Sequence, residues 1–385
     1  MIYIFYISFV LIFYIYIGYP LLLFLINLFK KNKNNTSDDY LPSVSIIIAA
    51  YNEEKVIEDK IKNTLDIDYP KEKLEIIIFS DSSNDNTDKI VKKYEKKGVK
   101  LLRIDGRKGK TYCQNRAVEK ARGEIIVFSD ANSMYQQDAI KKLVRNFTDE
   151  QVGCISGELK YISGKDIKSD NSSEGIYWKY EKNLKRLESK ISSLVGANGA
   201  IYAVRKKLYV NLADFSISDF AEPLLLFLKG FRTVYEPGAI AIEKNDDTFR
   251  ESYQRRVRIV TRTFSNIIKD KQLASTLNIF RFGIFSLQFI SHKLLRWFSG
   301  FFLILLIISN LVLYNQGIFY QIMLWGQVLF YFLALYGLLT ERFPGVRDIK
   351  VARVIFYFCL SCWAMLVGVK NGILNKEMRT WETNR

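Results

Sequence analysis

The stretch Val44-Ser-Ile-Ile-Ile-Ala-Ala50, followed by Tyr51-Asn-Glu-Glu54, decides how this chain folds. An uncharged run rich in β-branched residues is typical of a strand that is buried on both faces. Three further runs of this kind lie at residues 74–79, 99–104 and 124–128. Between the first two, Ile57, Ile61 and Leu65 recur at helical spacing. The alternation of strands and helices predicts an α/β fold with a mostly parallel sheet.

Polar and acidic residues follow three of these strands. A ligand site in such a sheet forms at the carboxyl ends of the strands, where Asp81, Asp130 and Asn132 stand. Neither a G-x-G-x-x-G nor a G-x-x-x-x-G-K-[ST] pattern follows the first strand, which argues against a Rossmann dinucleotide site or a P-loop. The oxygens of Asp130 and Asn132, together with substrate phosphate oxygens, suit Mg²⁺ or Mn²⁺. Alternatively, Asp81 and Asp130 only cap the helices that follow them.

The composition indicates that some segments of the chain lie in water and others in a membrane. Of the 385 residues, 49% are hydrophobic and 25% are charged, so very apolar stretches must offset very polar ones. Residues 2–29 carry no charge, and about 20 apolar residues suffice to cross a bilayer. No basic region precedes this run and no small-residue cleavage site follows it, so we predict a retained anchor rather than a signal peptide. Further spans are predicted at residues 297–313, 318–339 and 351–369.

The stretch 279–297 differs because polar residues interrupt its apolar pattern, which predicts a helix lying in the membrane interface with His292 at headgroup level. The expected domains are an anchor and basic linker (1–40), a cytosolic domain (41–278), and the interfacial helix with the C-terminal spans (279–385). Lys30, Lys31 and Lys33 beside the first span indicate the cytoplasmic side. Four spans would place the basic tail outside, so either the interfacial stretch or the last run is expected not to cross simply.

Charge and cysteine content exclude other classes. The formal net charge is +16, but the basic residues flank the spans and helix faces and no recognition motif appears, so we expect no nucleic-acid partner. The four cysteines lack the spacing of a disulfide scaffold or zinc finger. Cys359 and Cys362 form a C-x-x-C pattern, but they lie within a predicted span.

Two motifs resemble a known family. Ser45-Ile-Ile-Ile-Ala-Ala-Tyr-Asn-Glu-Glu54 is close to the first-strand signature of the family 2 inverting glycosyltransferases, in the membrane-anchored form related to cellulose, chitin and hyaluronan synthases. Asp81 with Ser83, Asp85 and Thr87 matches the family's D-D-G-S-x-D-x-T block, although Ser80 and Ser82 replace an Asp and the Gly. The resemblance covers nearly the whole chain. It implies a nucleotide-diphospho-sugar transferase (glycosyltransferase A) domain with α-helical transmembrane segments.

The resemblance also implies roles for individual residues. Asp81 would hold the uridine of a UDP-sugar, and Asp219 in Ile217-Ser-Asp-Phe220 would be the general base. Asn132 stands at the second acidic position of the D-x-D motif, where a neutral oxygen binds a divalent ion less strongly than a carboxylate does. The expected donor-binding residues are Tyr51, Glu53, Asp81, Lys110, Asp130, Arg255 and Arg258, and the expected metal ligands are Asp130 and Asn132.

Three features leave alternatives open. Gln254-Arg-Arg-Val-Arg258 is similar to the Q-x-x-R-W region of processive synthases, but no Trp follows it, which weakens a prediction of long-chain polymerisation. Its arginines and Arg262 could face pyrophosphate or bind anionic lipid headgroups. The stretch 195–202 resembles the family's donor and acceptor floor, where glycines allow the backbone to approach a sugar. Trp178 could stack on a sugar or pack on a helix face.

The predicted function is membrane-bound, metal-assisted transfer of a sugar from a UDP-sugar to a growing polysaccharide or lipid-linked glycan, with Asp219 removing the acceptor's proton. The alternatives are a polyprenyl-phosphate glycosyltransferase and a catalytically silent scaffold of a polysaccharide synthase complex. The expected partners are the lipid bilayer and export or synthase subunits. The expected location is a bacterial inner membrane, with the catalytic domain facing the cytoplasm.

Overall fold

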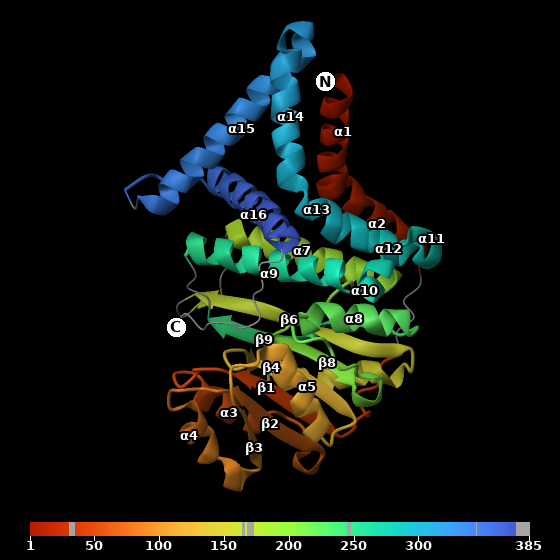
Figure 1. The fold of residues 1–385 in the computed structure, drawn as a ribbon, viewed down its shortest axis with the longest axis vertical. Helices are drawn as coiled ribbons and strands as arrows, with labels where there is room; N and C mark the ends of the chain where they lie inside the picture. Colours follow the sequence, from red (N-terminus) through yellow and green to blue (C-terminus); the bar gives the residue numbers. More distant parts are fainter. Residues whose placement is uncertain (31–34, 164–165, 168–172, 245–247, 344, 375–385) are drawn as a thin grey trace.

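The computed structural model describes residues 1–385 except 31–34, 164–165, 168–172, 245–247, 344 and 375–385. A nine-stranded sheet forms the centre of the polar part, in the order β3-β2-β1-β4-β8-β6-β9-β5, with β7 paired to β6 (Figure 1). The strands are β1 (Val44–Ala50), β2 (Leu74–Asp81), β3 (Val99–Ile104), β4 (Ile125–Asp130), β5 (Met134–Tyr135), β6 (Val152–Ser163), β7 (Asp166–Ile167), β8 (Ile201–Arg205) and β9 (Arg232–Lys244).

The predicted parallel strands are confirmed. β1 is buried at every residue and pairs in parallel with β2 and β4, while β2 pairs in parallel with β3. β2 and β4 run two residues further than predicted, so Asp81 and Asp130 are their last residues. The antiparallel pairings of β8 with β4 and β6 make the sheet mixed. The two acids therefore stand at the carboxyl edge of neighbouring parallel strands.

Helices cover both faces of this sheet. One apolar core joins β1 to α3, α4 and α6, and a second joins the opposite face to α5 and α8. α7 and α9 lie between the sheet and the apolar helices, as Figure 1 shows. The helices of the polar part are α3 (Ile57–Leu65), α4 (Thr87–Lys92), α5 (Lys110–Lys120), α6 (Ala139–Val144), α7 (Ser173–Ile191), α8 (Ser218–Leu228), α9 (Phe249–Lys269) and α10 (Lys271–Ser275).

Four helical stretches of the described chain are long and apolar enough to cross a membrane. The first, Ile2–Phe29, consists of α1 (Ile2–Phe13), a π-helical turn and α2 (Tyr19–Phe29). The others contain α14 (Ser299–Leu313), α15 (Ile318–Arg342) and α16 (Lys350–Ile373). These stretches agree with the predicted spans in number and place.

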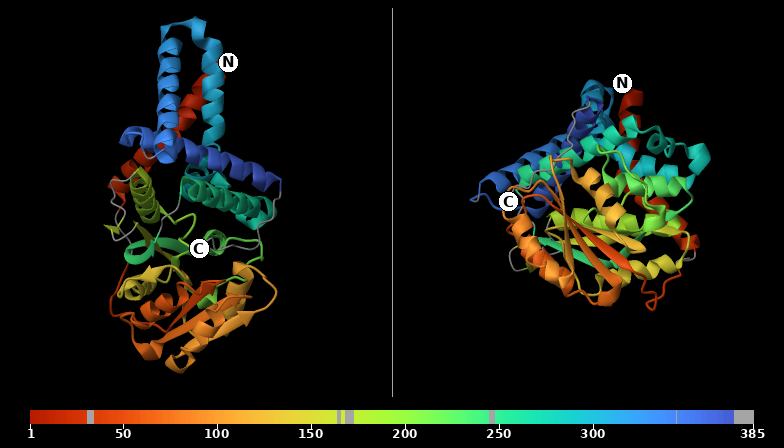
Figure 2. Two further views of the ribbon diagram at one scale, coloured as in Figure 1. Left: turned by 90° about the vertical axis from the view of Figure 1, so that its left-hand side faces the viewer. Right: turned by 60° about the horizontal axis from the view of Figure 1, so that its bottom comes forward.

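The last of these helices lies differently from the others. Figure 2 (left) shows α16 crosswise to α14 and along α9, and α16 also packs against α15. The close fit of α16 on α9 depends on small residues, because a Cβ on Gly368 would lie 2.7 Å from the Cβ of Val260. The expectation that the interfacial stretch or the last run does not cross simply stays a prediction. The basic tail at 375–385 lies outside the described residues.

The stretch predicted as one interfacial helix is divided. It forms α11 (Ile279–Phe282), α12 (Ile284–Phe289), a π-helical turn and α13 (Leu295–Trp297). Gly283 separates the first two pieces with a φ of 53°, a left-handed backbone that glycine adopts without strain. Phe285 and Phe289 are fully buried in a core shared with α8, α9 and α16, so this segment packs within the protein.

Candidate active site

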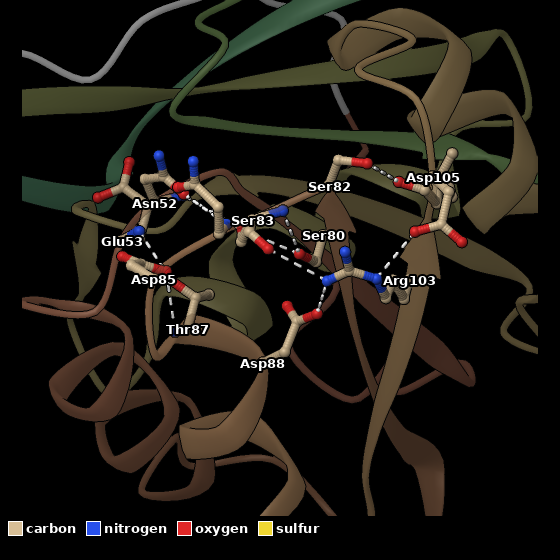
Figure 3. A network of polar contacts seen from close by, with 12 residues as sticks. Asn52, Glu53, Ser80, Ser82, Ser83, Asp85, Thr87, Asp88, Arg103 and Asp105 are labelled. Carbon is tan, nitrogen blue, oxygen red and sulfur yellow. Dashed lines mark hydrogen bonds and ion pairs between the residues drawn. The ribbon is translucent and has the colours of Figure 1, made fainter.

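The loops that follow β1 and β2 are joined by hydrogen bonds at the carboxyl edge of the sheet (Figure 3). The backbone N–H of Glu53 donates to Oγ1 of Thr87 at 2.8 Å, and that of Asn52 donates to Oγ of Ser83 at 3.2 Å. Arg103, from β3, donates to the carbonyl of Ser83 at 3.1 Å. These contacts hold the two loops and β3 in one arrangement.

These loops and the loop after β3 contain the described non-glycine residues with a left-handed backbone. Asn52, Ser82 and Arg107 have φ values of 51°, 58° and 49°, and they follow β1, β2 and β3 respectively. Non-glycine residues adopt this region uncommonly, and strained backbone concentrates at functional sites. Ser82 stands where the family pattern has its glycine, so the turn keeps the glycine conformation without the glycine.

Asp81 holds the loop that follows β3. Its side chain is fully buried and accepts hydrogen bonds from the backbone N–H groups of Lys108 at 2.7 Å and Gly109 at 3.0 Å. The guanidinium of Arg107 also donates to it at 3.2 Å and stacks on the ring of Tyr51, 3.2 Å from the centroid. Asp81 also accepts a hydrogen bond from the thiol of Cys113 at the start of α5, so this one carboxylate ties β2, the loop after β3 and α5 together.

Lys110 and Asp130 form the most direct ion pair of the site. The ammonium in the first turn of α5 lies 2.5 Å from a carboxylate oxygen at the end of β4. Asn132 lies two residues further on and is half-buried. The loop is supported from below, because the fully buried Lys60 donates to the carbonyl of Ser133. Burial lowers the pKa of Lys60 to about 7, against the opposing effect of Asp130.

Asp219 stands in the first turn of α8, facing the stretch 195–200. A Cβ added to Gly199 would lie 2.9 Å from Oδ2 of Asp219, so any larger residue here would displace this carboxylate. The backbone N–H of Ala197 donates to the carbonyl of Asp219 at 2.7 Å and fixes the start of the helix against this stretch. Burial raises the pKa of Asp219, Lys110 lowers it and Asp130 raises it. Asp219 therefore belongs to the same electrostatic cluster as the Lys110–Asp130 pair.

The arginines of α9 divide between two faces. About 100° separate successive residues of an α-helix, so Arg255, Arg258 and Arg262 share one face. Burial and Arg255 lower the pKa of Arg258, and Asp130 raises it. Burial lowers the pKa of Arg262 and Asp219 raises it, so these two groups also face each other. Arg256 instead lines a cavity between the apolar helices.

The predicted site residues lie at the ends of β2 and β4, in the loops after β1 and β4, at the starts of α5 and α8, and on α9. Tyr51 and Glu53 lie in the first loop, while Arg255 contacts the ring of Tyr161, 5.5 Å from its centroid. Trp178 packs on Tyr161, with the two ring centroids 5.3 Å apart. Sequence reasoning did not single out Arg107, although a basic residue after the third strand would have been a signal.

The prediction that His292 lies at headgroup level is wrong. Its ring is buried between two acids of α7: Nδ1 lies 2.8 Å from Glu188 and Nε2 lies 3.2 Å from Glu181. Arg296 also pairs with Glu181. Burial lowers the pKa of His292, but Glu188 and Glu181 outweigh it, so the net pKa is raised. The polar residues that suggested an interfacial helix form this internal network.

The side-chain oxygens of Asp130 and Asn132 determine what kind of metal site this edge of the sheet could form. The described residues contain no group of three or more His, Cys, Asp and Glu side chains arranged to hold a metal ion. Asp130 and Asn132 offer one carboxylate and one amide, and Asp130 already faces the cation of Lys110. Mg²⁺ commonly takes one or two carboxylates and completes its shell with phosphate oxygens and water. The residues therefore fit a metal that is shared with a phosphorylated substrate, not one held by protein alone.

Comparison with known proteins places these residues in context. Residues 45–209 match the family described as Glycosyl transferase family 2. The chain is 26% identical over 265 residues to the poly-beta-1,6-N-acetyl-D-glucosamine synthase of Staphylococcus aureus (strain COL), covering 67% of this chain and 63% of that protein. It is 27% identical over 239 residues to the probable glycosyltransferase YdaM of Bacillus subtilis (strain 168), covering 57% and 54%. The chain thus spans less than two thirds of the length of these relatives.

A solved structure extends the likeness beyond the matched region. The mannosyltransferase PcManGT from Pyrobaculum calidifontis, solved in complex with GDP-Man and Mn²⁺, superposes with a TM-score of 0.73 at 20% identity. The superposition covers 97% of this chain and 100% of that one, so the shared fold includes apolar helices as well as the sheet. The family match ends at residue 209, before Asp219 and α9.

Proposed function

We propose that this chain, which matches glycosyltransferase family 2 over residues 45–209 and has the glycosyltransferase A fold, moves a sugar from a UDP-sugar to a polysaccharide or lipid-linked acceptor with inversion at the anomeric carbon. One observation carries the proposal: Asp219, the Lys110–Asp130 pair and the arginine face of α9 converge at the carboxyl edge of the sheet. This group of residues supplies a proton acceptor, a carboxylate that is paired with a lysine, and positive charge that could bind a diphosphate.

The loops after β1, β2 and β3 would receive the nucleoside end of the donor. The Tyr51 ring stacked with Arg107 offers a flat surface for a base, and the carboxylate of Asp81 is an acceptor that a nucleoside could share with the donors of the loop. Because these groups are already fixed by hydrogen bonds, little ordering remains to oppose binding. Asp81 would then act both by holding the loop and by contacting the nucleoside.

Lys110, Arg258 and Arg262 would balance the charge that develops on the departing diphosphate. Cations fixed in place before the reaction stabilise developing charge without reorganisation. Asp130 and Asn132 would hold Mg²⁺ or Mn²⁺ jointly with the diphosphate, and such an ion supplies further charge neutralisation when bound. Lys110 would exchange its present partner, Asp130, for a phosphate oxygen.

Asp219 would accept the proton of the acceptor hydroxyl. The hydroxyl oxygen forms a bond to the anomeric carbon as the bond from that carbon to the diphosphate oxygen breaks, and the bonding electrons leave with UDP. A base on the side opposite the leaving group implies inversion. The raised pKa of Asp219 strengthens it as a proton acceptor, because a base is most effective when its pKa approaches the working pH.

The membrane helices would hold this site at a bilayer surface. Lys30, directly after α2, and the basic linker that follows favour the cytoplasmic side, where UDP-sugars would reach the site. We therefore propose a multi-pass protein of a bacterial inner membrane with the catalytic domain in the cytoplasm. Export or synthase subunits would be the expected partners.

Nucleotide release tests the proposal. The full-length protein in nanodiscs would be given a panel of UDP- and GDP-sugars with Mn²⁺ or Mg²⁺ and native lipid extract, starting with UDP-N-acetylglucosamine because of the name of the staphylococcal relatives. We expect release from one UDP-sugar, loss of release with chelator, and a product of inverted anomeric configuration by NMR. UDP binding by calorimetry without release from any donor would contradict the proposal and favour a silent scaffold.

A further inference from the structure

A cavity of about 760 Å³ lies among the apolar helices and is also lined by Tyr180 of α7 and Arg256 of α9. Its walls come from α1, α14, α15 and α16, and its lining is mostly apolar, as in Phe9, Phe13, Leu306, Ile322, Met323 and Phe330. In Figure 1, α14 and α15 diverge from a shared end, and α16 spans the space between the lower part of α15 and α9. Tyr180 of α7 and Arg256 of α9 close the side of the cavity that faces the sheet, and we call this side its floor.

Two arginines stand at the floor of this cavity. Among the described residues that line it, Arg256 of α9 and Arg296 of α13 are the charged ones. Arg296 stacks between aromatic rings, 5.8 Å from the centroid of Tyr16 and 5.7 Å from that of Tyr180, and it pairs with Glu181. An apolar chamber with guanidinium groups at one end matches an amphiphile with a long hydrocarbon chain and an anionic head.

A polar side chain in the wall strengthens this interpretation. Gln327 of α15 lines the cavity, and both its amide oxygen and its amide nitrogen are buried without a hydrogen-bond partner in the described chain. An unsatisfied polar group at membrane depth is costly, so such groups usually face a ligand or water-filled space. A largely apolar wall disfavours a bare glycan, whose hydroxyl groups would lose their hydrogen bonds to water there.

One helix, α9, contributes residues to both the cavity and the active site. Arg256 faces the cavity, while its neighbour Arg255 lies over Tyr161, on which Trp178 packs. Arg258, one turn further along α9, interacts with Asp130. A helix with its side chains is about 10–12 Å thick. A chain of basic and aromatic groups therefore leads from the cavity around α9 to the carboxylates.

We propose that this cavity holds the tail of a lipid-linked saccharide acceptor, whose phosphate lies at Arg256 and Arg296 and whose sugar extends past Tyr161 and Trp178 toward Asp219. This inference rests on the proposed function and names its acceptor. The phosphate is bound across α9 from Asp219, so a sugar hydroxyl, not a phosphate oxygen, attacks the anomeric carbon. Its proton goes to Asp219, and the bond to UDP breaks with the electrons leaving on UDP. An earlier transferase must therefore attach the first sugar to the lipid phosphate.

Photo-cross-linking of the full-length protein in nanodiscs tests the site. The probe is a polyisoprenyl phosphate with a diazirine in its tail, and the competitors are the same lipid without diazirine, the corresponding alcohol and a soluble oligosaccharide. Ile322→Trp fills the cavity from an exposed position of α15, and Leu335→Trp is the matched control because Leu335 is similarly exposed but does not line the cavity. Arg256→Gln removes one phosphate ligand. Peptide mapping identifies the labelled helices.

We expect labelling on the facing sides of α1, α14 and α15, reduced at least fivefold in Ile322→Trp and Arg256→Gln and unchanged in Leu335→Trp. The lipid phosphate should compete at least tenfold better than the alcohol. Labelling of outer helix faces, an unaffected Ile322→Trp, or competition by the oligosaccharide would overturn the inference, the last in favour of a glycan path. Transfer to a polyisoprenyl diphosphate disaccharide should fall in both variants.

A separate readout distinguishes this inference from the proposed function. Slow transfer of sugar from the UDP-sugar to water needs no lipid, and it should persist in Ile322→Trp. Cavity labelling without nucleotide release from any donor would support the lipid site and contradict the proposed transferase. Nucleotide release and transfer that are equal in wild type and Ile322→Trp would overturn the lipid site and leave the transferase intact.

Discussion

The ammonium of Lys110 lies 2.5 Å from a carboxylate oxygen of Asp130, which is 20 residues away along the chain. This pair joins the first turn of α5 to the end of β4, the two elements that flank the expected position of a diphosphate. Both side chains retain some solvent exposure, so the pair can open when a ligand competes for either partner. It therefore places a cation for a phosphate and a carboxylate for a metal next to each other.

Lys110→Gln should weaken donor binding. A hydrogen bond to a charged group contributes about 1.5–3 kcal/mol, so we expect the Kd for UDP to rise roughly tenfold or more. Calorimetry with UDP and Mn²⁺ measures this. Lys120→Gln is the control, because Lys120 is exposed at the other end of the same helix. Equal UDP affinity in Lys110→Gln and wild type would remove Lys110 from the donor site.

Gly199→Ala should slow transfer without weakening nucleotide binding. The new methyl group would lie 2.9 Å from Oδ2 of Asp219 and would push the carboxylate from its position. A displacement of about 1 Å can cost on the order of 100-fold in rate. Gly196→Ala is the matched control in the same stretch, since its Cβ would meet Asp219 only at an ordinary contact distance of 3.6 Å. A normal kcat in Gly199→Ala would show that the placement of Asp219 does not limit the reaction.

Asn132→Asp should lower the concentration of Mn²⁺ needed for half-maximal activity. A carboxylate binds a hard divalent cation more strongly than an amide oxygen does, and a second acid beside Asp130 adds negative charge. Asp130→Asn should raise that concentration. A metal titration of nucleotide release compares the three proteins. An unchanged titration in both variants would place the metal elsewhere or remove it from the reaction.

The ionisation of Asp219 should affect activity and stability in opposite directions. Because burial raises its pKa above the ordinary 3.8, the native protein keeps this proton to a higher pH than the unfolded chain does. The free energy of unfolding therefore falls as the pH rises from the ordinary pKa through the raised one, while the active carboxylate forms. Asp219→Asn removes the buried charge, so its melting temperature should exceed that of wild type more at about pH 7 than at about pH 4. The opposite trend would indicate that the charge is stabilised.

His292→Gln should destabilise the junction between the apolar helices and α7 most in mildly acid solution. The raised pKa of His292 means that its pairing with Glu188 and Glu181 stabilises fully below the ordinary 6.5 and is lost as the pH rises through the raised value. Breaking a buried pair costs about 3–5 kcal/mol. Thermal unfolding in detergent across this range measures the effect, with the exposed Arg281→Gln as control. A pH-independent loss would point to packing instead of charge.

The sequence predicted the parallel half of the sheet because β-branched runs that are buried on both faces are unambiguous. It predicted fewer features of the site, which depends on contacts between distant segments. The sequence left open whether Arg255 and Arg258 face pyrophosphate or lipid headgroups, because their surroundings depend on how α9 packs against distant segments. The environment of His292 was missed because its partners, Glu181 and Glu188, lie two turns apart on α7, more than a hundred residues earlier.

The central claim is that Asp219 is the base of a UDP-sugar transferase, and one paired measurement tests it most directly. The kcat for transfer and the Kd for UDP would be measured for wild type, Asp219→Asn and Asp214→Asn, the last being an exposed acid just before α8. We expect Asp219→Asn to lose kcat by roughly 100-fold or more while its Kd for UDP stays within about threefold, and Asp214→Asn to match wild type. Transfer by Asp219→Asn at the wild-type rate would contradict the claim.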